Sequence, residues 1–163
     1  MTTFRKSLIA VLGAVATVLA LSAPASAAPA PTEKATAASM GQIAEQTGQV
    51  WDEQKQEFAP AWTCASGYVC FYSGTGGSGR ACAWFGNDNH WLQGSVTCSW
   101  ADELQVKSVY NNGASTAYSG VRYYTRPDYN REYNAGCTPR GQHGTLNTPR
   151  WLRSHNWETG ACG

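Results

Sequence analysis

The stretch CASGYVCFYSGTGGSGR, residues 64–80, decides the fold predicted for this chain. Val69, Phe71 and the tyrosines beside them have the β-branched and aromatic side chains that favour strands. Four glycines from Gly74 to Gly79 then allow a turn with positive φ, a backbone conformation that side chains disfavour. The run ends in Ser-Gly-Arg and lacks the Gly-Lys-Ser/Thr of a phosphate-binding loop, so it predicts a folded β-hairpin.

The 163-residue chain begins with the features of a secretory signal peptide. Arg5 and Lys6 form the charged start, the apolar run 7–21 follows, and the small residues 25–27 supply a cleavage site. The apolar run is shorter than the roughly 20 residues that a membrane span needs. We therefore expect residues 1–27 to be removed, which predicts a secreted, extracellular protein with no membrane segment.

The charge balance argues against a nucleic-acid partner. The chain has 12 Lys and Arg against 11 Asp and Glu, and loss of Arg5 and Lys6 leaves the mature form near neutral. Nucleic-acid binding normally requires a basic face. The arginines cluster late, between Arg122 and Arg153, which fits either a basic surface for an acidic partner or a dispersed solvated face.

All six cysteines lie in the last 100 residues. An even number in an exported chain predicts a disulfide framework, and six cysteines can pair in 15 ways. Zinc is the competing interpretation, but there is no Cys-x-x-Cys pair and the three histidines are scattered, so we expect no metal site. The six are Cys64, Cys70, Cys82, Cys98, Cys137 and Cys162.

Residues 28–60 form a different compositional region, rich in Ala, Thr, Gln and Glu. Apolar residues between Met40 and Val50 hint at helical spacing, which Gly41 and Gly48 interrupt. The region predicts a flexible leader with a possible short helix. A docking helix or a propeptide is the alternative.

Residues 61–163 form the predicted domain, whose six tryptophans and eight tyrosines suffice for a small core that disulfides reinforce. Short runs with strand propensity alternate with clusters of Gly, Asn, Asp and Pro, and helical periodicity is missing. This pattern predicts an all-β sandwich or barrel. The expected strands are 69–72, 80–84, 95–100, 106–110, 121–124 and 150–154.

The segment Thr63–Gly79 resembles the amino-terminal segment of the secreted metalloproteinase-inhibitor family of Streptomyces, whose pattern is Ser-Cys-Pro-Ala-Gly-x-x-Cys-x-Tyr-Ser-Gly-Thr-Gly. The wider spacing is similar to a βγ-crystallin Greek-key motif, in which Tyr72 and Gly79 fit and Gly77 stands where a second aromatic is expected. The resemblance implies a disulfide-stapled, βγ-crystallin-like double Greek-key sandwich. It also implies a monomeric inhibitor of an extracellular protease, of the metalloprotease class, with no catalytic residues and no cofactor.

A weak internal repeat supports two motifs. Tyr124 lies 52 residues after Tyr72, and Ser154 lies 46 residues after Ser108. In the resembled fold, the late serine of each motif stabilises its folded hairpin. The second motif departs from the pattern at Arg131, which stands where glycine is expected.

The disulfide pairing rests partly on the same resemblance. It implies a bridge between the first two cysteines, which their adjacency also favours. The third and fourth cysteines share a Cys-x-Trp context, and elimination pairs the last two. The expected bridges are Cys64–Cys70, Cys82–Cys98 and Cys137–Cys162.

The resemblance also implies a protease-contacting loop. In the resembled inhibitors this loop is a small Cys-x-x-x-x-Cys ring; Cys137 takes the second position here, and Glu132 stands at the first, so the ring cannot close. The expected loop is therefore tied at one end and offers Tyr133 to an apolar specificity pocket. The alternative loop, Pro139–Pro149, carries Arg140, Gln142 and His143. The reactive-loop candidates are Glu132, Tyr133, Asn134, Ala135 and Gly136.

Calcium and catalysis find little support in the sequence. At the positions where a crystallin-type site needs oxygen ligands, the chain has Leu104 and Lys107 in one motif and Pro149 and Arg150 in the other. No catalytic motif such as His-Glu-x-x-His or Gly-x-Ser-x-Gly is present. The acidic and histidine side chains with the best spacing for acid–base chemistry also fit turns and solvated loops; they are Asp88 with His90 and Asp102 with Glu103.

A noncatalytic module that binds carbohydrate or cell wall, or a toxin-like crystallin module, is the alternative function. Such a module would stack sugar rings on exposed aromatic side chains, whereas most tryptophans of a small domain belong to its core. The tryptophans that could serve are Trp84, Trp91, Trp100, Trp151 and Trp157.

Overall fold

The computed structural model describes residues 36–53 and 55–162, so the expected signal peptide 1–27 lies outside the described residues. The structure is mostly β, with one α-helix and two 3₁₀ turns among these residues. The elements are α1 (Ala37–Thr47), β1 (Gln49–Asp52), β2 (Glu57–Pro60), β3 (Val69–Tyr72), η1 (Thr75–Gly77), β4 (Gly79–Trp84), β5 (Val106–Asn111), β6 (Gly120–Tyr124), η2 (Arg131–Tyr133), β7 (Asn134–Pro139), β8 (His143–Arg150) and β9 (Ser154–Glu158).

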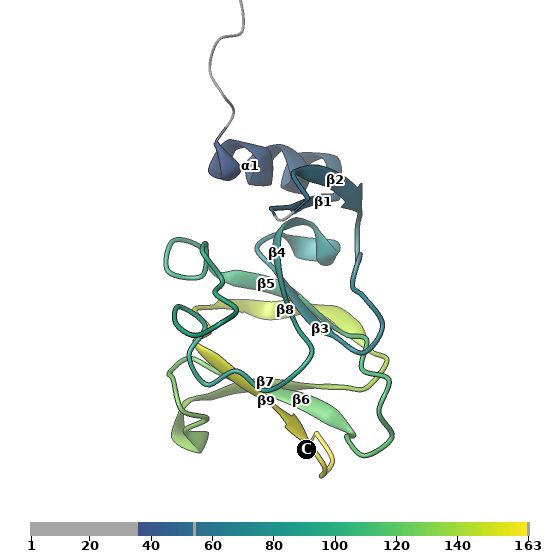
Figure 1. Cartoon of the computed structure of the whole chain (residues 1–163), viewed down its shortest axis with the longest axis vertical. Coiled ribbons are helices and arrows are strands. Elements are labelled where there is room, and N and C mark those ends of the chain that lie inside the picture. Colours follow the sequence, from purple (N-terminus) through teal and green to yellow (C-terminus); the bar gives the residue numbers. More distant parts are fainter. Residues whose placement is uncertain (1–35, 54, 163) are drawn as a thin grey trace, which may run out of the picture. The chain divides into compact units, whose positions relative to one another are not determined.

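Two sheets face each other, which confirms the predicted all-β sandwich (Figure 1). The larger sheet has the order β2-β1-β4-β3-β5-β8, and the smaller has the order β7-β6-β9. The core lies between them: Val69 and Phe71 of β3 and Val109 of β5 pack with Val121 and Tyr123 of β6 in one buried cluster. These side chains alternate along their strands, as expected where one face of a sheet meets another.

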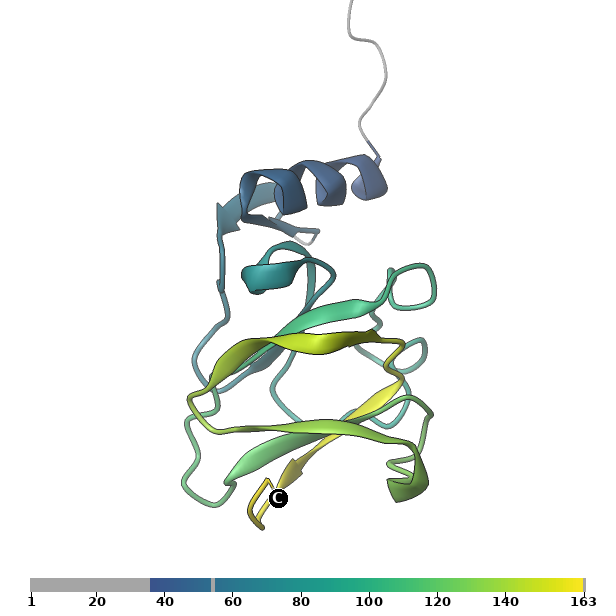
Figure 2. The same cartoon turned by 180° about the vertical axis from the view of Figure 1, so that it is seen from behind.

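The two halves of the chain exchange strands. β8, from the second half, pairs antiparallel with β5 of the first half, and Figure 2 shows it lying along the larger sheet above β7. In the other direction, Asp88 of the first half forms an antiparallel bridge with His155 of β9. The larger sheet therefore contains backbone from both halves, and the smaller sheet, formed by β7, β6 and β9, is bridged to the first half at one residue pair.

The described part of region 28–60 is folded, where sequence analysis expects a flexible leader with a possible short helix. Helix α1 is capped by Thr36, whose side chain accepts from Ser39 N, and it ends at Gly48 in the left-handed conformation. β1 then pairs in parallel with β4, and β2 pairs antiparallel with β1. Burial of Val50 and Trp51 stabilises this folded segment, an effect that its composition does not predict.

A buried ion pair fixes this amino-terminal hairpin. The guanidinium of Arg80, on β4, is 5% exposed and bonds the Glu53 carboxylate and the hydroxyl of Ser99. Ser99 Oγ in turn donates to Glu53 Oε2 at 2.9 Å. A second pair joins Lys107 Nζ to Glu45 Oε1 on α1 at 2.6 Å.

The strand predictions are wrong at two places. Residues 95–100 form turns and no strand; their apolar side chains Cys98 and Trp100 reach the core from a loop, which mimics a strand pattern. Residues 150–154 divide between the end of β8 and the start of β9, with a break at 151–153. β7 and β8 were not expected, because they are edge strands whose mostly polar, exposed residues lack a strand signal.

Each half contains a hairpin folded over a serine. In the first, Gly77 N donates to Ser108 Oγ at 3.0 Å and Ser108 Oγ donates to Gly74 O at 2.7 Å. In the second, Tyr129 N donates to Ser154 Oγ at 3.3 Å and Ser154 Oγ donates to Arg126 O at 2.7 Å. The serine role implied by the family resemblance is thus present in both halves.

Three disulfides join Cys64 to Cys70, Cys82 to Cys98 and Cys137 to Cys162, so all six cysteines are used. The first two bridges lie in the first half of the domain, and the third ties β7 to the carboxy-terminal tail. Among the described residues, no helix has the length and apolar character to cross a membrane.

Candidate functional site

The reactive-loop candidates lie on η2 and the start of β7. Asn130 caps the turn, because its Oδ1 accepts from Glu132 N at 3.0 Å and its carbonyl accepts from Tyr133 N at 2.9 Å. The backbone is then tied to β6, since Thr125 N donates to Tyr133 O at 3.0 Å. The segment is therefore a hydrogen-bonded turn that leads into an edge strand.

A register shift in β7 decides which candidates face outward. Tyr124 pairs with Asn134 and Tyr123 pairs with Gly136, so Ala135 is the extra residue of a β-bulge and packs against the core. Gly136 lies against the ring of Tyr123, where a Cβ would come within 2.7 Å of the phenol oxygen. Only the first part of the candidate segment, residues 132–134, is exposed.

Tyr133 is the large side chain that this segment presents. It is 38% exposed, and the guanidinium of Arg126 lies 5.7 Å from the centre of its ring. Arg131 Nη2, at the start of the same turn, lies 3.6 Å from Glu158 Oε1 on β9. Tyr133 is thus held by backbone bonds and a cation–π contact while much of its ring remains accessible.

The covalent brace differs from the family's small ring. Cys137 bonds to Cys162 in the tail, so a bridge begins just after the candidate segment and does not span it. The other two bridges lie entirely before residue 99. Peptide bonds in 132–136 consequently have no disulfide that crosses them.

The alternative loop Pro139–Pro149 is tied down more firmly. Its turn is held by Gly141 N donating to Asn111 O at 2.8 Å and by Gln142 N donating to Pro139 O at 3.1 Å. The rest of it is β8, where the ring of His143 lies 4.4 Å from that of Trp62. This segment is an edge strand with its own sheet partner.

The acid–base candidate at Asp88 is occupied by structural bonds. Asp88 Oδ2 accepts from Trp84 Nε1 at 3.0 Å, and Oδ1 accepts from His90 N at 2.9 Å, which is a turn contact. The carboxylate therefore holds the loop that carries His90. For the other candidate pair, Glu103 Oε2 lies 3.8 Å from Arg80 Nη1, and Asp102 is exposed.

His155 is the titratable group that sequence analysis missed. It is fully buried beneath aromatic rings; its Nδ1 accepts from Trp91 Nε1 at 2.8 Å, which leaves Nε2 to donate to Gly86 O at 3.0 Å. Burial lowers its pKa to about 4, and the bond to Gly86 opposes part of that shift. The neutral imidazole is a structural crosslink between the halves.

The tryptophans proposed for sugar stacking divide sharply by exposure. Trp84, Trp91 and Trp100 are at most 3% exposed and belong to the core. Trp157 is partly buried, whereas Trp151 is 42% exposed. Buried rings cannot stack on a sugar, so Trp151 is the exposed member of the set.

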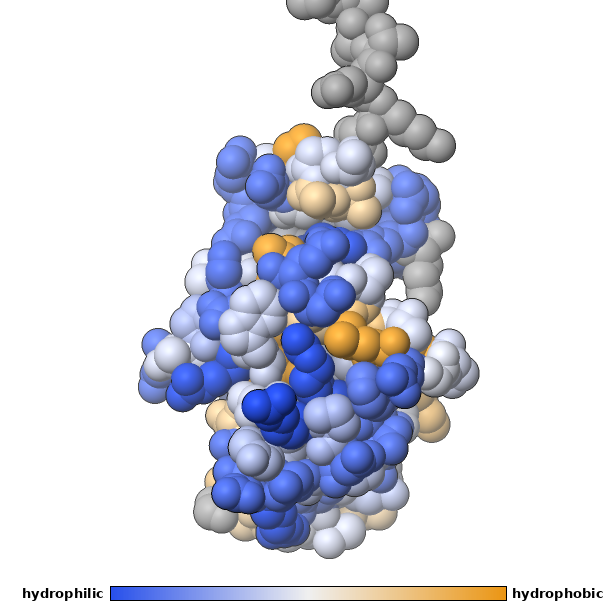
Figure 3. All heavy atoms as spheres, turned by 90° about the vertical axis from the view of Figure 1, so that its left-hand side faces the viewer, coloured by the Kyte–Doolittle hydropathy of each residue, from blue (hydrophilic) through white to orange (hydrophobic). Residues whose placement is uncertain are grey.

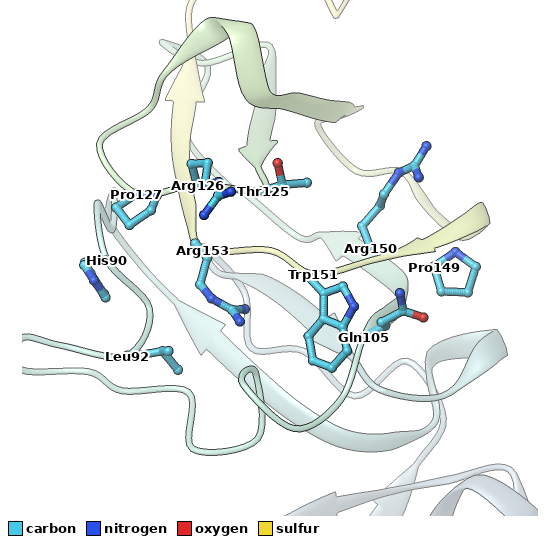
Figure 4. A pocket seen from close by; sticks show the side chains of 10 residues that line it. All are labelled: His90, Leu92, Gln105, Thr125, Arg126, Pro127, Pro149, Arg150, Trp151 and Arg153. Atoms are coloured by element: carbon cyan, nitrogen blue, oxygen red, sulfur yellow. The ribbon is translucent and has the colours of Figure 1, made fainter.

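Trp151 lines a hollow of about 660 Å³ that sequence analysis did not predict (Figure 4). The hollow also contains Arg126, Arg150 and Arg153, and in the view of Figure 4 Arg126 and Arg153 lie on one side of Trp151 with Arg150 on the other. The clustering of arginines late in the chain was the available signal, but the residues come from separate segments. The other lining residues are His90, Leu92, Gln105, Thr125, Pro127 and Pro149.

Comparison with known proteins supports one family. Residues 57–136 match the model of peptidase inhibitor family I36, which confirms the resemblance noted at Thr63–Gly79. The match covers the hairpin stretch and reaches the end of the candidate segment. Neither the comparison with curated proteins nor that with solved structures gave a match.

Proposed function

We propose that this chain inhibits a metalloprotease through the segment Glu132–Gly136, because residues 57–136 match the model of peptidase inhibitor family I36, a noncatalytic family. Tyr133 is the residue that enters an apolar specificity pocket of the enzyme. The family match supports a protease as the partner, and the proposal adds the enzyme class and the contacting segment.

The proposal rests on the turn around Tyr133, whose backbone is held by hydrogen bonds while its side chain is exposed. Bonds from Asn130 and Thr125 hold the backbone on both sides of Tyr133, while its ring is 38% exposed. A preformed segment loses little conformational entropy on binding, so more of its contact energy appears as affinity. Aromatic side chains are also frequent anchors at interfaces.

The fold and location of the inhibitor are part of the same proposal. The strand exchange between β5 and β8, with a serine inside each folded hairpin, supports a βγ-crystallin-like double Greek key. We propose that residues 1–27 direct secretion and that the protein acts outside the cell as a monomer. Sequencing of the exported product should then find a first residue near Ala28, and an intact Met1 would contradict this route.

Titration against a thermolysin-like metalloprotease tests the function. We expect inhibition at micromolar protein or below, and Tyr133→Ala should weaken it by about tenfold, as expected for an anchor residue. Tyr118→Ala is the matched control, because Tyr118 is also a tyrosine on the surface with 39% exposure. It should change inhibition by less than about twofold.

A subtilisin-like serine protease in the same assay tests the enzyme class. Selective inhibition of the metalloprotease supports the proposal, and selective inhibition of the serine protease overturns the class. If the wild-type protein slows neither enzyme at micromolar concentration, the proposed function is wrong. If Tyr133→Ala and Tyr118→Ala have equal effects, the contacting segment lies elsewhere.

A further inference from the structure

The three arginines around the hollow lie together without a carboxylate partner among the described residues. Among the described residues, Arg80 pairs with Glu53, and Arg122 lies 3.0 Å from Glu158 Oε1. Arg126, Arg150 and Arg153, by contrast, form no ion pair in the part of the chain that the structure describes. Three unpaired guanidinium groups around one hollow create a locally positive potential.

One of these arginines is fixed in place by the backbone. Arg153 Nη1 donates to the carbonyls of Ala101 at 2.7 Å and Leu152 at 2.8 Å. These bonds orient the guanidinium and use one nitrogen, so Nε and Nη2 have no hydrogen-bond partner among residues 36–53 and 55–162. Burial, the main cause, and the nearby Arg126 charge lower the pKa of Arg153, whereas Asp102 raises it. An anion bound between Arg126 and Arg153 would offset the repulsion between their positive charges.

The rest of the wall is apolar or neutral. Leu92, Pro127, Pro149 and the indole of Trp151 line the hollow, with Arg153 5.9 Å from the indole ring centre. No carboxylate is among the lining residues. On the face drawn in Figure 3, strongly hydrophilic side chains lie directly beside hydrophobic ones.

We propose that this hollow binds an acidic peptide segment of a partner protein, with carboxylates on Arg126, Arg150 and Arg153 and an apolar side chain against Trp151. Guanidinium groups pair with carboxylates in bidentate geometry, which favours arginine at such sites. A polyphosphate would meet the same charges, but it has no apolar part for the indole and the prolines. The mixed lining therefore favours a peptide.

The position of the hollow beside Tyr133 indicates that its partner is the target protease, an inference that rests on the proposed function. Arg126 contacts the ring of Tyr133, and Thr125, also in the lining, donates its N–H to Tyr133 O. The hollow and the proposed inhibitory segment thus form one continuous surface. A protease held at Tyr133 would place the rim of its cleft over the hollow, so the target should carry acidic residues beside its active site.

Direct binding of a hexaglutamate peptide tests the hollow without any protease. We expect NMR shifts at the Trp151 indole and the Arg153 side chain, with an affinity that falls as salt rises, and no shifts with hexalysine. Arg126→Gln with Arg150→Gln should weaken binding by about tenfold, because each removed charge accounts for roughly a three- to fivefold change. Both side chains are exposed and make no hydrogen bond to the residues that the structure describes, so the fold should survive.

Arg140→Gln is the matched control. Arg140 is an exposed arginine with no carboxylate partner within the described ranges, but it lies outside the hollow and its guanidinium donates to Ser115 O. It should leave hexaglutamate binding unchanged. Equal loss in this variant, no shift at Trp151, or equally tight binding of a polyphosphate of the same charge would overturn the acidic-peptide assignment.

Inhibition assays separate this proposal from the proposed function. Arg150→Gln should slow association with the target about fivefold at low salt and little at high salt, since it removes an attractive charge remote from Tyr133. Tyr133→Ala should retain full hexaglutamate binding. If hexaglutamate binds but the wild-type protein inhibits no protease, the hollow is an acidic-peptide site and its assignment to a protease is overturned.

Discussion

Each of the two folded hairpins is closed by a serine in the same role, Ser108 or Ser154, but their backbones differ. The first reaches its left-handed positions with Gly76 (φ 63°) and Gly77 (φ 70°), whereas the second uses Asp128 (φ 65°) and Tyr129 (φ 54°). A residue with a side chain at positive φ costs roughly 1–2 kcal/mol, so the second hairpin is less stable than it would be with glycine at these two positions. The hairpin built of glycine packs Gly77 against Trp62, and the one that keeps side chains borders the proposed binding surface.

Gly77→Ala should have the largest effect. Its Cβ would adopt left-handed geometry and would meet the ring of Trp62, so we expect a loss of about 4 kcal/mol from strain and overpacking together. Gly76→Ala is the matched control: its φ is also positive but its surroundings are open, which predicts a loss of about 1 kcal/mol. Urea unfolding measures both, and equal losses would remove the distinction between strain and crowding.

The residue after each serine differs in a second way. Val109 follows Ser108, and the buried His155 follows Ser154. The unfolded imidazole has a pKa near 6.5 and the folded one near 4, so the folded state resists protonation. The contribution of His155 is fully present above pH 6.5 and is lost as the pH falls through 4, by about 3 kcal/mol.

Unfolding measured from pH 7 to pH 4 checks this dependence against His155→Gln. The variant should lose about 3 kcal/mol less over that range, because the carboxylates titrate in both proteins and the imidazole in only one. An identical pH profile for the two proteins would show that the histidine takes no part.

Ser108→Ala and Ser154→Ala compare the two serines directly. Ser108 is fully buried and its bonds are 3.0 and 2.7 Å long, so its loss leaves two buried backbone groups unpaired and should cost about 3 kcal/mol. Ser154 is equally buried and donates to Arg126 O at 2.7 Å, but both of its bonds are only partly buried and the bond from Tyr129 N is longer, 3.3 Å, so about 1 kcal/mol is expected. Equal costs would mean that both hairpins depend on their serine alike.

Asp128→Gly should have the smallest effect. Glycine relieves the left-handed strain but loses the bond from Asn89 Nδ2 to Asp128 Oδ1 at 3.0 Å and gains entropy in the unfolded chain. These changes nearly cancel, so the free energy of unfolding should stay within about 0.5 kcal/mol of wild type. A loss above about 1 kcal/mol would show that the carboxylate contributes more than its geometry indicates.

The centre of the fold is predictable from local sequence patterns, whereas its edges are not. Strand 69–72 and the start of β5 carry β-branched and aromatic residues that are buried in the sheet, so their propensity and their packing agree. β8 alternates in exposure but is polar and contains Pro149, which only an edge strand tolerates. Its pairing depends on β5, about 35 residues away in the chain, and no local pattern records it.

The same limit applies to the site. The candidates Glu132–Gly136 follow from the family resemblance, but the bulge at Ala135 that turns part of the segment inward depends on pairing with β6. The arginine hollow joins the loop after β6 to the segment between β8 and β9. Composition revealed that arginines are abundant late in the chain, and only the fold determines which of them meet.

The strand exchange has a consequence for a substrate-like inhibitor. A protease cut within 132–136 would leave two polypeptides with no covalent link, because no bridge spans that segment. Yet β6, on one polypeptide, lies between β7 and β9 on the other, and β8 remains paired with β5. The nicked molecule would persist as a heterodimer whose melting temperature rises with concentration. A cleaved inhibitor would therefore dissociate and unfold on dilution.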